Sequence, residues 1–439
     1  MHPFATYVLR SYYKATGWNE DNLYSNLTRS SSALLDFAVP RGLHFSISKS
    51  PNALFRTTYS MNALPSLNGS VGYIFTSCPL NLASSRDVRF KELVDRFRIF
   101  DQPRRPQPKE EVWLGGERVD SRDYLLYGRL YIPTGRLDAV YTTRMSTNLQ
   151  TVIAAISDPR ADAAQLTGRA GASPSNVMFS LQHDTGRTCT EYTYSAEDMM
   201  LGARVLHNFG RIGGIAPVPE NGEARERTKR IDEEDAMEGG LKGRISAGAE
   251  LYFSAKEKSA GVSTGIRFTT LPDATPPSFH MPPEPSAFPP FAVSAGTSEP
   301  TPSTLSQPPT TITALFNPMM GHISGAYAAR VSRELALGSR FDFNVYSYES
   351  EWTMGAEWWL HRGHGQAQTD AAAADGLPYS PYDVTGVVKA RASTSNELAL
   401  MWEGRIRNML VGIGVAANLS NRAKPIRSLG LELSYFSSG

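Results

Sequence analysis

Apolar and polar residues alternate along several stretches of this chain. The C-terminal residues 428–435 alternate small or polar residues with leucine and tyrosine, and residues 245–253, 262–268 and 411–419 repeat the pattern. Charged residues such as Glu250 fall on the small-or-polar side. Because successive side chains of a strand point to opposite faces, each stretch predicts a β-strand with one apolar face and one polar face.

Turn residues between such runs divide the chain into about nineteen predicted strands. The predicted strands cover residues 42–50, 53–62, 69–78, 124–132, 137–146, 148–157, 176–183, 188–195, 199–208, 241–253, 259–270, 310–317, 321–331, 338–348, 352–361, 382–392, 396–406, 409–419 and 427–436. The turn between the fifth and sixth strands is so short that this pair is the least clearly separated. Strands of this length, with one polar and one apolar face, are typical of a membrane β-barrel.

Four long segments interrupt the predicted strands. Residues 79–123, 209–240, 271–309 and 362–381 follow the third, ninth, eleventh and fifteenth strands. In an up-and-down meander every connection after an odd-numbered strand leaves on the same side, so we expect these segments to share one face. Residues 158–175 form a shorter exception on the opposite face. An odd number of strands also requires the first and last strands to pair in parallel, as in the mitochondrial porin VDAC.

Helical spacing replaces the two-residue period at the N-terminus. Phe4, Tyr7, Val8 and Tyr12 fall on one face of an amphipathic helix predicted within residues 1–41. We expect this helix to lie in or near the lumen, as a plug or a lining segment, followed by a lead-in to the first strand. The alternative is a matrix-targeting segment, because the first acidic residue comes late. The tyrosine-rich apolar face favours the lumen helix.

Composition narrows the classes of protein. The 44 Lys and Arg residues balance the 43 Asp and Glu residues, so no basic footprint for nucleic acid is present. Only Cys78 and Cys189 are available, which rules out a disulfide scaffold and indicates a reducing compartment. No apolar run approaches the roughly 20 residues of a spanning helix, yet a mean hydropathy of −0.31 is compatible with an alternating barrel. We expect an all-β fold, a transmembrane barrel over residues 42–439.

Several stretches carry a family resemblance. They are ATGWNEDNLYSNLTRSSSALLDF, VPRGLHFSIS, GSVGYIFTSCPL, LYGRLYIPTGRLDAVYTTRMS and the closing SLGLELSY. Through them the chain resembles the fungal family of mitochondrial distribution and morphology protein 10, over most strands and both ends. The resemblance implies a VDAC-like barrel of about nineteen strands in the mitochondrial outer membrane. It also implies that the four long segments face the cytosol.

The resemblance further implies partners and a role. It implies membership of the ER–mitochondria encounter structure, with its ER-anchored and soluble lipid-transfer subunits and an outer-membrane morphology subunit. It also implies association with the core barrel and peripheral subunits of the sorting and assembly machinery. The expected role is a non-enzymatic anchor for phospholipid exchange, mitochondrial morphology and import-pore assembly, in contact with membrane lipid and without cofactor or nucleic acid. The alternative is a VDAC-like metabolite channel.

The resemblance also assigns a targeting signal to the last strand. Its pattern, a polar residue, glycine and two apolar residues at fixed spacing, is matched by Ser428, Gly430, Leu433 and Tyr435. An extended strand can add to an exposed strand edge of an insertion machine through backbone hydrogen bonds, while alternate side chains report its identity. The alternative is an ordinary closing strand, which has the same alternation.

The first long segment contains a second candidate site. Phe90, Leu93, Val94 and Phe97 form an apolar stripe among basic residues. The spacing predicts a basic amphipathic helix that docks in a partner's groove or lies on anionic lipid. The alternative is a helix that packs over the rim of its own barrel.

Other patterns predict no chemistry. The nucleophile-elbow pattern around Ser263 needs a strand-to-helix turn, whereas Ser263 falls inside a predicted strand. The dinucleotide-like glycines from Gly412 are not followed by a helix, and we expect them to ease curvature or to admit the N-terminal segment. His361 and His364 lack nearby partners for a metal and are expected at the rim beside Trp358 and Trp359, which suit an interfacial aromatic girdle. No catalytic residue, metal ligand or cofactor site is therefore assigned. A soluble β-propeller is disfavoured because no blade-length repeat occurs.

Overall fold

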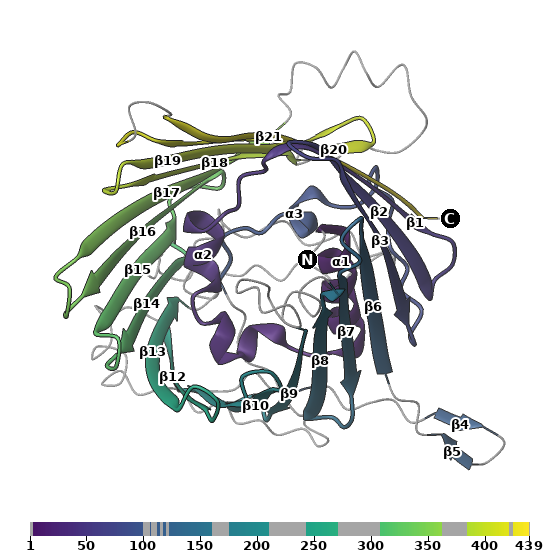
Figure 1. Ribbon diagram of the computed structural model, residues 1–439, viewed down its shortest axis with the longest axis horizontal. Helices are drawn as coiled ribbons and strands as arrows, with labels where there is room; N and C mark the ends of the chain where they lie inside the picture. The colour runs from purple at the N-terminus through teal and green to yellow at the C-terminus, as the bar shows by residue number, and fades with distance from the viewer. Residues whose placement is uncertain are drawn as a thin grey trace, which may run out of the picture.

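The protein is a closed β-barrel seen down its axis in Figure 1. The computed structural model describes residues 3–99, 106, 112–114, 117–119, 123–159, 175–209, 243–270, 308–361, 384–420 and 425–438. Nineteen strands form one sheet that wraps around three short helices. A separate two-stranded ribbon, β4 (Val112–Leu114) and β5 (Glu117–Val119), stands apart from the barrel in Figure 1.

The elements follow one another around the wall in chain order. The helices are α1 (Pro3–Thr16), the 3-10 turns η1 (Glu20–Asn22) and η2 (Tyr24–Asn26), α2 (Arg29–Leu35) and α3 (Phe90–Leu93). The barrel strands are β1 (Gly42–Ser50), β2 (Phe55–Leu64), β3 (Asn68–Thr76), β6 (Asp123–Ile132), β7 (Leu137–Arg144), β8 (Leu149–Ser157), β9 (Asn176–Asp184), β10 (Thr188–Ser195), β11 (Met200–Asn208), β12 (Gly243–Ser254), β13 (Ser259–Thr270), β14 (Thr310–Asn317), β15 (His322–Arg330), β16 (Leu335–Asn344), β17 (Ser350–His361), β18 (Val384–Ser393), β19 (Glu397–Ile406), β20 (Met409–Asn418) and β21 (Ile426–Ser438).

The predicted strand number and closure are confirmed. Every strand pairs antiparallel with its neighbours in the sequence, except at the seam where β1 and β21 pair in parallel. The register of this seam runs from Gly42 opposite Gly430 to Ser50 opposite Ser438. The least clearly separated predicted pair is present as β7 and β8, which pair from Leu137 opposite Ser157 to Arg144 opposite Gln150.

The two faces of the wall differ in polarity as the alternation predicts. Large apolar side chains are exposed on the outside, for example Ile47, Leu251 (55% exposed), Ile266 and Trp358. The inner face carries small, polar and charged side chains, and many of these are buried beneath segments inside the barrel. The apolar surface of the sheet therefore faces outward, opposite to the arrangement in a water-soluble barrel with an apolar core.

The meander brings the C-terminal ends of β3, β11, β13 and β17 to one end of the barrel, here called the loop rim. The four long predicted segments begin at these strand ends. The opposite end, the turn rim, is where β2, β10, β14 and β16 end. No helix among the described residues is long and apolar enough to cross a membrane.

The predicted N-terminal helix is present as α1, which covers only the first part of residues 1–41. It ends at Thr16 because Gly17 takes a positive φ of 69°, a conformation that glycine adopts without steric cost. The Trp18 N–H then donates to the Tyr13 carbonyl at 3.0 Å, which caps the helix in a Schellman arrangement. The chain can therefore turn away from the helix axis and follow the barrel wall.

The occupied lumen as a candidate functional site

The helix α1 lies inside the barrel against the strands near the seam. Phe4, Tyr7, Val8 and Tyr12, the predicted lumen face, are all buried. They form one apolar cluster with Ile74, Leu80, Val88, Leu125, Tyr127 and Phe436. Figure 1 shows α1 inside the ring of strands, beside β3 and β6. The structure thus brings these four residues together on the inner wall, as expected for a lining segment.

The rest of the N-terminal segment, residues 3–41, runs around the inner wall in the order of the strands. Asn22 donates to Asp184 of β9 at 2.7 Å, and the Tyr24 hydroxyl lies 2.9 Å from Ser263 Oγ of β13. The helix α2 then packs on β14 to β18. The segment makes an almost complete circuit before it enters β1, so its position depends on most of the barrel.

A second segment, the inner loop (residues 79–99), also lies within the barrel. Its helix α3 (Phe90–Leu93) is a single turn, so the predicted amphipathic helix over the whole stripe from Phe90 to Phe97 is wrong. Phe90, Val94 and Phe97 are buried against the chain's own wall: Phe90 and Val94 pack with Trp359, and Phe97 packs with α2. Leu93 is partly buried beside α1. The extended backbone after α3 lets the stripe reach wall positions that one rigid helix could not.

Ion pairs join the N-terminal segment to the inner loop. Arg10 of α1 pairs with Asp95, and Arg98 of the loop pairs with Asp21 of η1. Arg29 contacts the same Asp21 at 3.0 Å. The Ser30 hydroxyl also donates to the Arg98 carbonyl at 2.8 Å. We call the two segments together the plug, because each is held partly by the other.

Cationic side chains of the wall hold the main chain of the plug. The acceptors are plug carbonyls in each case: Arg144 donates to Thr16, Arg330 to Phe97, Lys389 to Ala33 and Asp95, Arg391 to Leu35, and Arg405 to Arg86 and Val88. Lys389 is only 2% exposed. A buried cation without acceptors is costly. These wall cations therefore need the plug carbonyls as acceptors, and the plug needs the cations to hold its main chain in place.

Burial and charge shift the pKa of several plug residues, among them Asp21, Asp95 and Lys91. Burial raises the pKa of Asp21, and Arg98 and Arg29 offset this only in part. Burial would also raise the pKa of Asp95, but Arg10 together with Arg29 and Lys389 outweighs it and holds that pKa below its usual value. Burial, reinforced by the charges of Arg96 and Arg330, lowers the pKa of Lys91 to about 8. The loop therefore carries an amine that is partly neutral near physiological pH.

A cavity of about 1040 Å³ remains beside the plug. Both plug segments line it, together with Lys389, Met401 and Glu403 of the wall. Its lining mixes cations such as Lys14 and Arg96 with anions, so it has no single charge sign. The residual space is thus a polar chamber inside the barrel and is bounded by the plug.

The four predicted signal residues all lie on β21 but on different faces. Ser428 and Gly430 face inward, whereas Leu433 and Tyr435 face outward opposite Phe45 and Ile47 of β1. Gly430 lies beneath the lead-in: a Cβ added there would lie 2.3 Å from the Pro40 carbonyl oxygen. The finished barrel therefore constrains Gly430 for its own reason, independent of any recognition during insertion.

The remaining sequence candidates have structural roles. Ser263 lies inside β13 and contacts Tyr24, as its predicted strand position required. The Gly414 position is covered by Val39 and Pro40, so the N-terminal segment does approach the wall there. His361 Nδ1 lies 3.2 Å from a Glu334 carboxylate oxygen, and His364 lies outside the described residues.

The two adjacent tryptophans of β17 point to opposite faces. Trp358 is 53% exposed on the outer wall, but Trp359 is buried and packs edge-on against Phe90. The predicted position of Trp359 in an exposed rim girdle is therefore wrong, because adjacent residues of a strand alternate in direction. Among the described residues no group of three or more His, Cys, Asp or Glu side chains could hold a metal ion.

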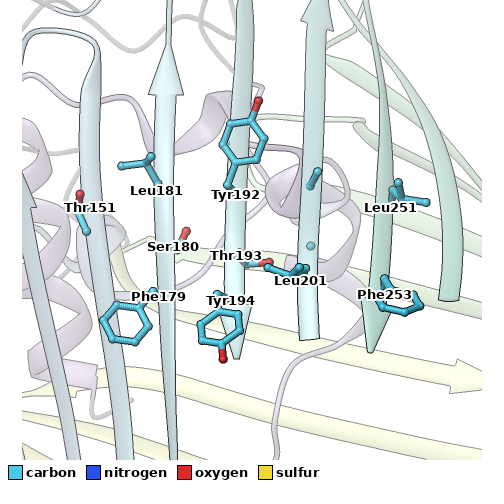
Figure 2. Close-up of a pocket in the computed structure, with 12 residues that line it drawn as sticks. Thr151, Phe179, Ser180, Leu181, Tyr192, Thr193, Tyr194, Leu201, Leu251 and Phe253 are labelled. Atoms are coloured by element: carbon cyan, nitrogen blue, oxygen red, sulfur yellow. The ribbon is translucent and has the colours of Figure 1, made fainter. Parts of the chain in front are cut away.

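The outer wall has a shallow apolar hollow over β8 to β12. Figure 2 shows its lining, in which Phe179, Leu181, Tyr192, Tyr194, Leu251 and Phe253 surround smaller side chains. The hollow forms because Ala203 stands directly between Tyr192 and Leu251 in the register. Its volume is about 440 Å³. A surface of this kind is suited to contact with hydrocarbon rather than with water.

Sequence reasoning missed the circuit of the N-terminal segment and the burial of the inner loop. A signal for the circuit exists in retrospect: glycines occur on the inner face of β12, β13, β16, β17, β20 and β21, where the segment passes. These are Gly248, Gly265, Gly338, Gly355, Gly414 and Gly430. The signal for the loop is weaker, because burial of its phenylalanines depends on wall residues far away in the sequence.

Comparison with known proteins identifies similar chains over the full length. The sequence profile of the family described as mitochondrial distribution and morphology protein 10 matches residues 1–380 and 378–438. The protein of that name from Postia placenta is 68% identical over 457 residues, and the one from Laccaria bicolor is 66% identical over 452 residues. Both alignments cover 100% of each chain. The protein of that name from Cryptococcus neoformans var. neoformans serotype D is 42% identical, covering 99% of each chain.

Proposed function

The chain belongs to the family of mitochondrial distribution and morphology protein 10, and from this premise we propose that it is a non-enzymatic anchor in the mitochondrial outer membrane. In this role the barrel holds other subunits at the membrane and does not serve as a wide metabolite pore. The name of the family associates its members with the distribution and shape of mitochondria.

The outer wall supports the membrane location. Exposed Leu, Ile, Val, Phe and Met side chains project from strands all around the barrel. A monomeric soluble protein rarely exposes a contiguous apolar surface of this extent. Closed barrels are also one of the two structures that satisfy all backbone hydrogen bonds within a bilayer. The surface chemistry therefore favours lipid as the surroundings of the wall.

The plug is the observation that carries the choice between anchor and channel. A VDAC-like channel needs an open lumen, whereas here residues 3–41 and 79–99 both lie inside the barrel. Ion pairs, wall cations and apolar clusters fix them. These contacts hold the two segments in the space through which metabolites would pass.

We further propose two sets of partners. One is the encounter structure, with its ER-anchored and soluble lipid-transfer subunits and the outer-membrane morphology subunit. The other is the sorting and assembly machinery, with its core barrel and peripheral subunits. The apolar outer wall offers a surface for neighbouring barrels, and the loop rim offers one for soluble subunits. Because Phe90, Val94 and Phe97 are buried inside the barrel, they are not proposed as the partner-binding surface.

Single-channel recording tests the anchor against the channel. We expect the purified full-length protein in a planar bilayer to show conductance far below that of an open barrel of this strand number. The R10A/D95A double variant, which removes the ion pair between α1 and the inner loop, should raise the frequency of open events. A wide, anion-selective and voltage-gated conductance in the unmodified protein would instead support the metabolite channel.

Affinity purification tests the two sets of partners. The full-length protein with a C-terminal tag, isolated from fungal mitochondria in mild detergent, should retain subunits of both assemblies in separate complexes. Recovery of the protein alone, from membranes in which both assemblies are intact, would contradict the anchor role.

A further inference from the structure

The last part of the N-terminal segment crosses the inner face of the seam. Figure 1 shows the chain leaving α2 and passing inside β20 and β21 on its way to β1. Val39 and Pro40 lie on Gly414 of β20, and Pro40 with Arg41 lies on Gly430 of β21. The next residue, Gly42, is already paired with Gly430 in the parallel register of β1 and β21.

The contact at Gly430 involves backbone atoms on both sides. A Cβ added at Gly430 would lie 2.3 Å from the Pro40 oxygen, 2.4 Å from the Pro40 carbonyl carbon and 2.8 Å from the Arg41 nitrogen. These distances are far below van der Waals contact, and no side-chain rotation can relieve them. Any side chain at this position must therefore displace either the lead-in or β21.

Gly414 and Gly412 provide a graded comparison on the neighbouring strand. At Gly414 the shortest distance is 2.8 Å, to a Val39 methyl carbon that can rotate away, followed by 3.1 Å to the Pro40 ring and 3.4 Å to the Leu400 carbonyl oxygen. At Gly412 the nearest atoms are side-chain carbons at 3.8 Å and 4.0 Å, which is ordinary packing. All three glycines face the lumen, so they differ mainly in how closely the lead-in approaches.

The order of the chain ties this contact to closure of the barrel. The seam is the pair of strands most distant in sequence, and it forms only when β21 meets β1. The lead-in enters β1 directly from its position on β21, so the pairing of Gly42 with Gly430 fixes Pro40 against the same glycine. The lead-in therefore takes its place on Gly430 together with the pairing of β1 and β21.

We propose that Gly430 is a closure residue: its missing side chain lets the Pro40–Arg41 main chain lie against β21, and this seating is required for β1 and β21 to pair. The role differs from that of a recognition signal, because it belongs to the finished barrel. It also holds whichever partners the barrel anchors. In this proposal the inward-facing Gly430 serves closure of the barrel, whereas the outward-facing Leu433 serves recognition during insertion.

A disulfide across the seam measures closure directly. Ser46 of β1 and Ser434 of β21 are opposite in register, with their hydroxyl oxygens 2.9 Å apart. In a full-length chain with C78S and C189S, the substitutions S46C and S434C should give a cross-link on treatment with diamide after import into isolated mitochondria. Adding G430A should lower the ratio of cross-linked to free protein by at least about fivefold, as expected for an overpacked site.

Three controls make the result specific. G412A should leave the cross-link unchanged, and G414A should have an intermediate effect. A second cysteine pair, S180C and T193C, lies opposite in the register of β9 and β10, and its cross-link should persist in the G430A chain. The proposal is overturned if G430A matches G412A at the seam, or if both cross-links are lost equally, since that would mark a general folding defect.

Discussion

Single side chains of the plug combine burial with charge, and Lys91 is the clearest example. Its ammonium group lies 5.7 Å from the centre of the Trp359 ring, and Arg96 and Arg330 add unfavourable positive charge. Because its folded pKa of about 8 lies below the ordinary lysine value of 10.5, the charged form is penalised in the folded state. Stability should therefore rise as the pH increases from about 8 towards the unfolded pKa.

Lys91 should consequently react as an unusually nucleophilic amine. We expect competitive acetylation of the detergent-solubilised protein to show a titration midpoint near 8 for this residue. The R330Q variant should move the midpoint upward, because it removes one of the repelling charges. A midpoint near the ordinary lysine value of about 10.4 would contradict the burial of this side chain.

Substitution of Leu433 distinguishes a targeting role of β21 from the role of an ordinary closing strand. Leu431 and Leu433 both face outward on β21, but only Leu433 occupies a position of the proposed signal. A recognition role predicts that L433D leaves newly made protein extractable by alkaline carbonate, and that L431D does so much less. Equal extraction of the two variants would leave β21 as a closing strand without a signal at this position.

At the scale of the elements, the inner loop is held by a few buried anchors. Phe97 is 0% exposed and packs on Leu34 and Leu35 of α2. Its backbone N–H donates to Glu357, and its carbonyl accepts from Arg330. Loss of the ring would leave a cavity beneath α2 without removing these polar contacts. The anchoring of the loop therefore depends on packing as well as on charge.

The F97A variant should loosen the loop and α2 together. Truncation of a buried phenylalanine costs about 3–5 kcal/mol, so hydrogen exchange of amides in residues 85–99 should accelerate by about 100-fold or more if the loop opens locally. L93A, at a partly buried position, should have a smaller effect. Unchanged exchange in F97A would mean that the polar contacts alone hold the loop.

At the scale of the whole molecule, the sheet is folded with its apolar face outward. This arrangement is stable only where hydrocarbon surrounds the wall, since water would leave the exposed leucines and isoleucines unfavourably hydrated. Part of the polar inner face is then paired with the plug, which lies in the lumen. The barrel and the plug are thus complementary parts of one folded unit.

An arginine on the outer wall should be costly in proportion to its depth. A249R places a charge near the middle of β12 on its outward face, where about 2–4 kcal/mol is expected at the bilayer midplane. L67R, in the turn after β2, should cost about 0–1 kcal/mol. Integration of the two variants into membranes, compared with the unmodified chain, measures the difference. Equal integration would argue against lipid around the wall.

The sequence by itself determined the wall of the barrel. Alternation at residues such as Leu429, Leu431 and Leu433 specifies strands and their faces, because a period of two is a local property of extended backbone. Strand number follows from local turn signals, and the parallel seam follows from an odd count. Helical spacing likewise predicted α1, since Phe4, Tyr7 and Val8 lie within two turns.

Only the tertiary structure decided what fills the barrel. Phe97 meets Ala328, and Pro40 meets Gly430, across hundreds of residues, and no local pattern encodes such pairs. The stripe from Phe90 has helical spacing, yet its side chains are buried by three-dimensional neighbours that favour extended backbone after one turn. Contacts distant in sequence therefore override local spacing inside the lumen, whereas the wall obeys local spacing because its lipid-facing side has no protein neighbours to satisfy.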